Sequence, residues 1–319
     1  FKGTEDLGNG LKALFQAETN LNLTGGNGAS SAVTVSGTSN SAFGSLRDTY
    51  VGMSSKYGTM LGGYLSTPFR QSLTSFDVMP GATGAGTIEK IMGTMRFSNQ
   101  ALGTSATATA GAYEFGSSLR ATAIAYAMPT MYGFNASIAY TGSNNNGIDN
   151  RNTTVDGTST TQSSQTPNSA MSFNLGWTGY GVNLQGAFSQ AKYNLTDATV
   201  AANDVDATNA YTSYLVGAAY TGVPGLKVSA VYNRNSMGLN ANAADFNGAG
   251  KLSNNQFWTG ASYRMGNWEP RISAVWSSDI SGSTSNATSS AGARQWTANV
   301  GYYLSKRTQV YGLVSNLNN

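Results

Sequence analysis

Alternation of apolar and polar residues with a period of two is the feature that most constrains the fold of this chain. The segment MSFNLGWT places Met171, Phe173 and Leu175 on one face. Ser172 and Asn174 of the same segment lie on the other face. Successive side chains of a β-strand point to opposite faces, so this period predicts two-faced strands rather than helices. Similar alternation occurs in residues 11–21, 134–141, 182–190, 226–234, 254–265, 271–278 and 294–304.

The connections between these segments alternate in length. Short connections occur at 56–58, 129–133, 179–181, 221–225, 266–268 and 305–308. Long polar connections occur at 142–169, 194–209, 236–253 and 279–292. An antiparallel meander with short turns at one edge and long loops at the other is typical of an outer-membrane β-barrel. A soluble β-sandwich also alternates, so the period alone leaves both architectures open.

Aromatic residues near the strand ends favour the membrane barrel. Such rings gather where a membrane-spanning structure meets water, and they would form a girdle there. The expected members of this girdle are Tyr57, Tyr132, Trp177, Tyr180, Trp268, Tyr302 and Tyr303. Small Ala and Gly side chains also occupy many apolar-face positions, as they would where one subunit packs closely on another.

Composition excludes several classes of protein. Only 10% of the 319 residues are charged, against a usual ~25%, and 39 Gly with 17 Tyr favour strands and turns. The chain has no Cys and no His, which excludes a disulfide scaffold and a Ser–His hydrolase and leaves no expected metal or cofactor site. A net charge of +3 does not indicate a nucleic-acid partner. The sequence contains no run of 18 apolar residues, so no transmembrane helix is expected.

Several segments resemble general Gram-negative outer-membrane porins of the proteobacterial type. They are FKGTEDLGNGLKALFQAE, RDTYVGMSSKYGTMLGGY, AIAYAMPTMYGFNASIAY and YYLSKRTQVYG. The resemblance implies an antiparallel transmembrane β-barrel of sixteen strands, with 1–319 as a single domain that lacks the first and last strands. It also implies a homotrimer in the cell outer membrane, surrounded by lipid and lipopolysaccharide. Such a protein passes small hydrophilic solutes by passive diffusion and is not an enzyme.

The stretch YLSTPFRQSLTSFDVMPGATGAG at 64–86 is unusually apolar for a long connection. In the porin family the third external loop folds inward and narrows the channel, and the resemblance assigns residues 68–99 to this constriction loop. We expect Leu73, Phe76, Val78 and Met79 to pack against the barrel wall, with Asp77 facing the lumen. An Asp in a turn can also act as a cap of local backbone groups, which is the alternative for Asp77.

The resemblance also assigns the charged residues of the pore. Asp77 matches the acidic position of the loop, and Glu89 is the nearest substitute for a second acid that Gly81 has replaced. Arg47 matches a wall arginine, while Tyr64 stands where the family has another. The full set expected on the loop is Asp77, Glu89, Arg70 and Arg96. The full set expected on the pore wall is Arg47, Lys12, Glu18, Arg271, Lys227, Tyr64 and Arg120; by alternation Arg264 also falls on the polar face.

The expected function is a water-filled channel with modest, anion-leaning selectivity, since Lys and Arg outnumber the acids. The alternative is an outer-membrane barrel that acts mainly as an adhesin or as an anchor of the envelope.

Overall fold

A computed structural model describes residues 1–21, 43–80, 86–98, 112–116, 120–142, 167–194, 208–239, 250–282 and 292–318. The strands of its main sheet are β1 (Lys2–Gly8), β2 (Leu11–Gln16), β5 (Thr49–Ser55), β6 (Gly58–Ser66), β9 (Arg120–Ala127), β10 (Phe134–Thr141), β11 (Pro167–Gly179), β12 (Val182–Asn194), β13 (Thr208–Tyr220), β14 (Leu226–Leu239), β15 (Gly250–Tyr263), β16 (Trp268–Ser277), β17 (Ala293–Tyr303) and β18 (Gln309–Asn318). The remaining elements are β3 (Thr19–Leu21), β4 (Phe43–Leu46), α1 (Pro68–Ser75), η1 (Ile88–Lys90), β7 (Thr94–Ser98) and β8 (Ala112–Gly116).

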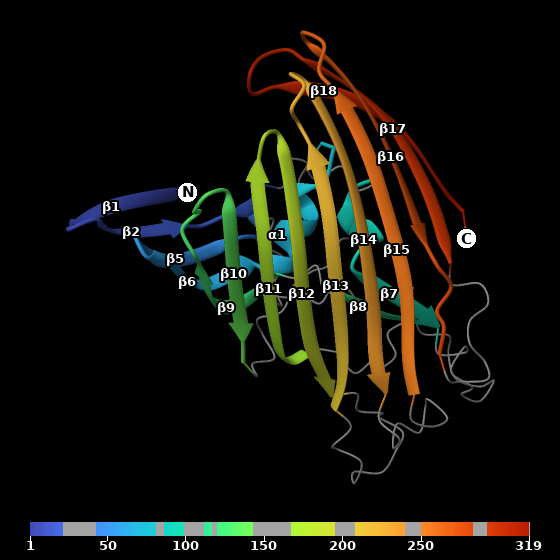
Figure 1. Cartoon of the computed structure of the whole chain (residues 1–319), viewed down its shortest axis with the longest axis horizontal. Coiled ribbons are helices and arrows are strands. Elements are labelled where there is room, and N and C mark those ends of the chain that lie inside the picture. The colour runs from blue at the N-terminus through green and yellow to red at the C-terminus, as the bar shows by residue number, and fades with distance from the viewer. Residues whose placement is uncertain are drawn as a thin grey trace.

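The main sheet has fourteen strands, which pair antiparallel in sequence order from β1 to β18. Short turns join the strands at one end of the sheet, and long connections join them at the other end (Figure 1). We call these two ends of the strands the short-turn edge and the long-loop edge. The predicted antiparallel meander is therefore confirmed. Within the described ranges, no helix has the length and apolar character needed to cross a membrane.

The two faces of the sheet differ as the alternation predicted. On β11, Phe173 and Leu175 are 41% and 51% exposed, whereas Ser172 and Asn174 are buried. The sheet is strongly curved, and α1 lies on its concave side (Figure 1). We call the concave face inward and the apolar, exposed face outward. An outward apolar face and an inward polar face are the pattern of a barrel whose outside meets lipid.

Tight turns join the strands at the short-turn edge. Tyr180 and Gly181, between β11 and β12, have φ angles of 52° and 76°. Two successive residues with positive φ form the hairpin turn whose twist matches that of the flanking strands. Tyr180 is 95% exposed. The turn therefore fixes the register of β11 on β12 while its aromatic ring extends away from the sheet.

Two short hairpins and two helices occupy the long connections. β3 pairs with β4, and β7 pairs with β8. α1 starts where Thr67, in an extended conformation, accepts a hydrogen bond on its side chain from Arg70 N, and Pro68 opens the first turn. A Thr cap followed by Pro is a favoured helix start. The Thr side chain accepts from an N–H group that has no partner within the helix, and Pro has no N–H group that needs one. α1 and η1 belong to the segment that follows β6.

Candidate functional site

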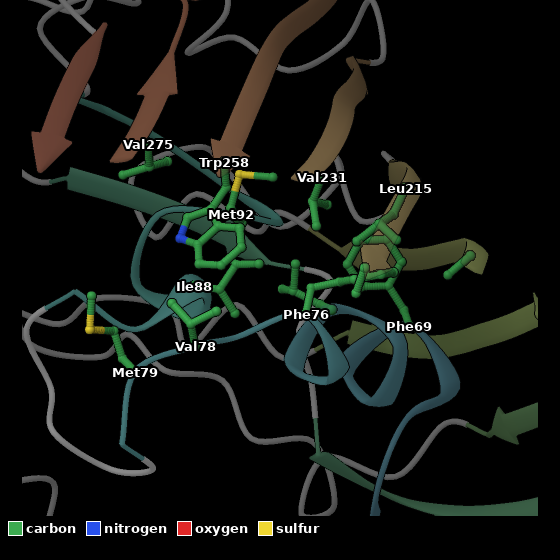
Figure 2. Packing of buried hydrophobic residues seen from close by; sticks show 13 residues of the cluster. Phe69, Phe76, Val78, Met79, Ile88, Met92, Leu215, Val231, Trp258 and Val275 are labelled. Carbon is green, nitrogen blue, oxygen red and sulfur yellow. The ribbon is translucent and has the colours of Figure 1, made fainter. Parts of the chain in front are cut away.

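The described residues 67–80 and 86–98, here called the inner segment, pack on the inward face of the sheet. Phe69, Leu73 and Phe76 are fully buried. Their partners include Trp258 and Val231 of the neighbouring strands β15 and β14 (Figure 2). The remaining buried members of this cluster are Val78, Met79, Ile88, Met92, Ala187, Leu215, Ala219 and Val275. The predicted packing of the apolar stretch against the wall is therefore confirmed.

The wall is shaped to receive this segment. Val231 of β14 is paired with Gly217 of β13 on one side and with Trp258 of β15 on the other, and Trp258 is paired with Val275 of β16. A side chain at Gly217 would meet the buried ring of Phe76, since a Cβ built there lies 2.6 Å from it. The absence of a side chain at this position therefore gives the aromatic ring its place against the sheet.

Buried amides hold the returning half of the inner segment. Gly93 N donates to Asn233 Oδ1 at 3.0 Å and to Gln256 Oε1 at 2.9 Å. Gln256 Nε2 in turn donates to the carbonyls of Ile91 and Thr94, both at 2.8 Å. Buried backbone groups are costly when unpaired, so these bonds determine where the segment can lie. We call Asn233 and Gln256 the amide anchors.

The predictions from sequence did not include the amide anchors. Two further contacts support the same segment: Tyr211 Oη donates to Gly93 O at 3.1 Å, and Asn235 Nδ2 donates to Thr94 O at 3.4 Å. All four side chains lie on inward positions of β13, β14 and β15. A polar side chain is expected at every such position in a water-filled pore, so no sequence signal distinguished these from their neighbours.

Asp77 closes a turn of the inner segment. Its Oδ1 accepts from Met79 N at 2.9 Å and its Oδ2 accepts from Ile88 N at 3.1 Å. Burial raises the pKa of the Asp77 carboxyl above its usual value, against the lowering effect of these two bonds and of the Lys227 charge. Lys227 Nζ donates to the carbonyls of Ser75 and Asp77 at 2.9 and 2.7 Å. The capping alternative for Asp77 is thus realised, and Lys227 connects the sheet to the end of α1.

Ion pairs engage most of the other charges expected at the site. Arg70 and Glu89, both in the inner segment, form a buried pair that connects α1 to η1. At the long-loop edge, Arg47 Nε lies 2.6 Å from Glu18 Oε1, and Gln16 donates to the same carboxylate. Glu18, which follows β2, and Arg47, which precedes β5, are therefore brought together.

Two further arginines have acidic partners. Arg120 Nε lies 3.0 Å from Asp48 Oδ1. Arg271, which is buried on β16, pairs with Glu269 and donates to Asn299 Oδ1 at 2.8 Å. Opposite charges at these distances cancel most of each other's field in a narrow space. None of these arginines presents an isolated positive charge to the lumen.

The remaining candidates from the sequence are Lys12, Tyr64 and Arg96. Lys12 is exposed and stands opposite Asp6 on β1. Tyr64 is paired with Thr122, which shares the outward face of β9 with Ile124. Arg96 belongs to β7, and its side chain lies outside the described part of the chain. Arg96 is thus part of the inner segment, whereas Lys12 and Tyr64 lie on β2 and β6.

The aromatic residues near the short-turn edge lie on both faces. Trp268 and Tyr302 contact each other with ring centroids 4.8 Å apart, and Trp268 is 54% exposed. The prediction that Tyr303 also belongs to the girdle is wrong. Its hydroxyl donates to the inward Glu269 at 2.6 Å, and Arg264 stacks over its ring at 4.0 Å. Adjacent strand residues face opposite ways, so 302 and 303 cannot both face lipid.

A curved antiparallel meander, apolar outside and polar inside, with a segment folded onto its inner wall, defines an outer-membrane protein of the pore-forming class. The chain belongs to the Gram-negative porin family, whose model matches residues 1–319. It is accordingly an outer-membrane channel for passive diffusion and not an enzyme. Among the residues that the structure describes, no group of acidic side chains could hold a metal ion.

Solved porin structures share the fold. The chain is similar to the anion-selective porin from Comamonas acidovorans, with 24% identity, a TM-score of 0.68, and coverage of 99% of this chain and 76% of that one. It is also similar to OmpF of Salmonella typhi, with 18% identity, a TM-score of 0.58, and coverage of 97% and 79%. The trimer form of OmpT of Vibrio cholerae gives 10% identity, a TM-score of 0.63, and coverage of 99% and 79%. No curated protein sequence matches the chain.

Proposed function

We propose that residues 1–319 belong to one transmembrane β-barrel domain in which residues 68–99 form a constriction loop. The observation that carries this proposal is that the inner segment packs on the inward face of the sheet. An apolar surface lined by Val231, Trp258 and Val275 would be unfavourable if it faced only water in the pore. Covered by the inner segment, the same surface fixes an obstacle inside the lumen and reduces its cross-section.

The channel is weakly selective and leans toward anions. Arg47, Arg70, Arg120 and Arg271 each have a carboxylate partner, so the transverse field that such charges would create is largely cancelled. The net charge of +3 supplies the anion lean. The similarity to an anion-selective porin is consistent with this sign.

The functional unit is a homotrimer in contact with outer-membrane lipid and lipopolysaccharide. Support for the trimer comes from the trimer form of OmpT of Vibrio cholerae, which has the same fold. Support for the lipid contact comes from the exposed apolar face, where Ile124, Val216 and Ile272 are 67%, 58% and 58% exposed. In water such an apolar face would promote aggregation, whereas in a membrane it contacts the lipid acyl chains favourably.

Conductance in planar bilayers tests the proposal. Insertion of the purified protein should give conductance steps in groups of three, and a salt gradient should give a small reversal potential of the sign for anions. A correctly folded protein that conducts no current would refute the channel and favour an adhesin or an anchoring protein. A strong cation preference would refute the selectivity but not the channel.

A further inference from the structure

One inward arginine at the short-turn edge has no acidic partner. Arg264 follows β15 directly, and by the alternation of that strand it shares the inward face with Trp258 and Ser262. Its side chain is exposed, and within the described part of the chain no carboxylate lies within 4 Å of its guanidinium. Arg264 therefore differs from the paired arginines of the site and presents a positive charge at the short-turn end of the pore.

The guanidinium of Arg264 is held in one place. Its Nε donates to Gly266 O at 3.3 Å, and its central carbon lies 4.0 Å from the centroid of the Tyr303 ring. A cation over an aromatic face is attracted by the electrons of the ring. The two terminal nitrogens of Arg264 donate to none of the described residues. Both of their N–H groups are therefore available to a ligand, although the side chain itself is ordered.

A chain of hydrogen bonds holds the ring in turn. Tyr303 Oη donates to Glu269 Oε2 at 2.6 Å, and Arg271 Nη2 donates to the same oxygen at 2.5 Å. Arg271 Nη1 donates to Asn299 Oδ1 at 2.8 Å. The charge of Glu269 is thus neutralised by Arg271 and does not cancel the charge of Arg264. We call Arg264, Tyr303, Glu269 and Arg271 the mouth cluster.

Hydrogen-bond donors outnumber acceptors around the mouth cluster. Asn299 Nδ2 and Gln309 Nε2 are buried and have no partner among the described residues. A Cβ built on Gly301 would collide with both Gln309 Nε2 and Arg271 Nη1, so these two donors converge beside that glycine. Buried polar groups without a partner are rare in proteins. The excess of N–H groups favours a ligand that brings oxygen acceptors.

The cations one row deeper in the pore already have partners. Lys227 is paired with Ser262, and Ser262 with Arg271, so the two cations lie in one row across the sheet. Lys227 donates to two carbonyls of the inner segment, and Arg271 donates to Glu269 and to Asn299. Of the three inward cations on β14–β16 and the turn after β15, only Arg264 has unused donors at both terminal nitrogens.

We propose that Arg264 binds the carboxylate group of small organic anions at the short-turn end of the pore. The two terminal N–H groups of a guanidinium match the two oxygens of a carboxylate, which a spherical halide ion cannot do. Tyr303 orients the guanidinium in advance, which lowers the cost of ordering it on binding. The site thus discriminates between anions of equal charge. This inference rests on the proposed anion-leaning channel and adds to it the residue and the class of anion.

Reversal potentials in planar bilayers test the proposal with two readouts. Potassium chloride on one side and potassium acetate on the other give the permeability of acetate relative to chloride. A gradient of potassium chloride alone gives the preference for anions over cations. The variants are Arg264→Ala, which removes the site, and Arg264→Lys, which keeps the charge but not the paired N–H groups. The matched control Arg307→Ala removes one charge from an exposed position in the turn between β17 and β18.

An exposed pair of an arginine and a carboxylate changes affinity by about threefold, so Arg264→Ala should lower the acetate-to-chloride permeability ratio by about that factor. The same variant should shift the reversal potential in the chloride gradient toward cations. Arg264→Lys should lower the ratio similarly but leave the chloride reversal potential unchanged. Arg307→Ala should shift the chloride reversal potential toward cations and leave the ratio unchanged.

Three outcomes would overturn the proposed carboxylate site. They are an unchanged ratio in Arg264→Ala, an equal fall of the ratio in Arg307→Ala, and a ratio in Arg264→Lys equal to that of the natural sequence, which would show that charge alone suffices. A folded natural protein that carries no current would instead refute the proposed channel. The chloride gradient reports on the anion lean separately from the acetate ratio, so the two proposals can fail independently.

Discussion

Removal of one amide anchor should loosen the inner segment without unfolding the sheet. Gln256 is 2% exposed and makes three hydrogen bonds to this segment, one to each of Ile91, Gly93 and Thr94. In the variant Gln256→Ala, Asn233 still accepts from Gly93 N, but Ile91 O loses its bond to the Gln256 amide. At about 1 kcal/mol for each bond, the free energy of opening of the segment should fall by about 3 kcal/mol.

Hydrogen exchange followed by mass spectrometry measures this change directly. A fall of about 3 kcal/mol corresponds to roughly a hundredfold faster exchange of amides that open locally. The acceleration should be confined to peptides covering 86–98, because the backbone pairing of β15 does not depend on the Gln256 side chain. The matched control is Gln295→Ala on β17, whose amide donates to Ser315 at 2.8 Å. Unchanged exchange in 86–98, or the same acceleration in the control, would refute the anchoring role.

Three further variants probe the charges and the packing of the pore. Because burial raises the pKa of Asp77, acidification should make the channel more anion-selective at a pH above the ordinary Asp range, and Asp77→Asn should remove that step from the titrated reversal potential. Arg47→Ala leaves Glu18 unpaired and should shift the reversal potential toward cations; a shift toward anions would contradict the assignment. Gly217→Val forces a side chain onto the ring of Phe76 and should destabilise the inner segment by about 1–3 kcal/mol, seen as faster exchange in 67–80.

The faces of the strands could be predicted from the sequence because they depend on a local rule. Every second residue of a strand points the same way, so Phe173 and Ser172 could be assigned to opposite faces without knowledge of their neighbours. The inward packing of Leu73 and Phe76 was also accessible, since a long apolar connection is unstable on a wet surface. Both inferences use only the residue type and its immediate surroundings in the chain.

The ion pairs could not be predicted in the same way. Arg70 and Glu89 meet because α1 and η1 fold back on each other in an irregular segment, where no periodicity relates the two positions. Arg120 reaches Asp48 across a sequence separation of 72 residues. The resemblance to porins suggested which charges belong to the pore, but the pairing depends on side-chain geometry. Pairing changes their electrical effect, because a charge with a close partner contributes little to a field across the lumen.

The register of the sheet explains why the inner segment lies where it does. Val231, Trp258 and Val275 interrupt the inward face at the same level of three neighbouring strands. A single apolar residue on the inward face does not indicate a packing surface. Together, at the same level of the sheet, the three residues form an apolar surface large enough to bury Phe76 and its neighbours. That alignment is set by the short turns, where a change of one residue would move every side chain of a strand to the other face. Turn length at the short-turn edge therefore controls the position of the obstacle inside the pore, although the two are far apart in the sequence.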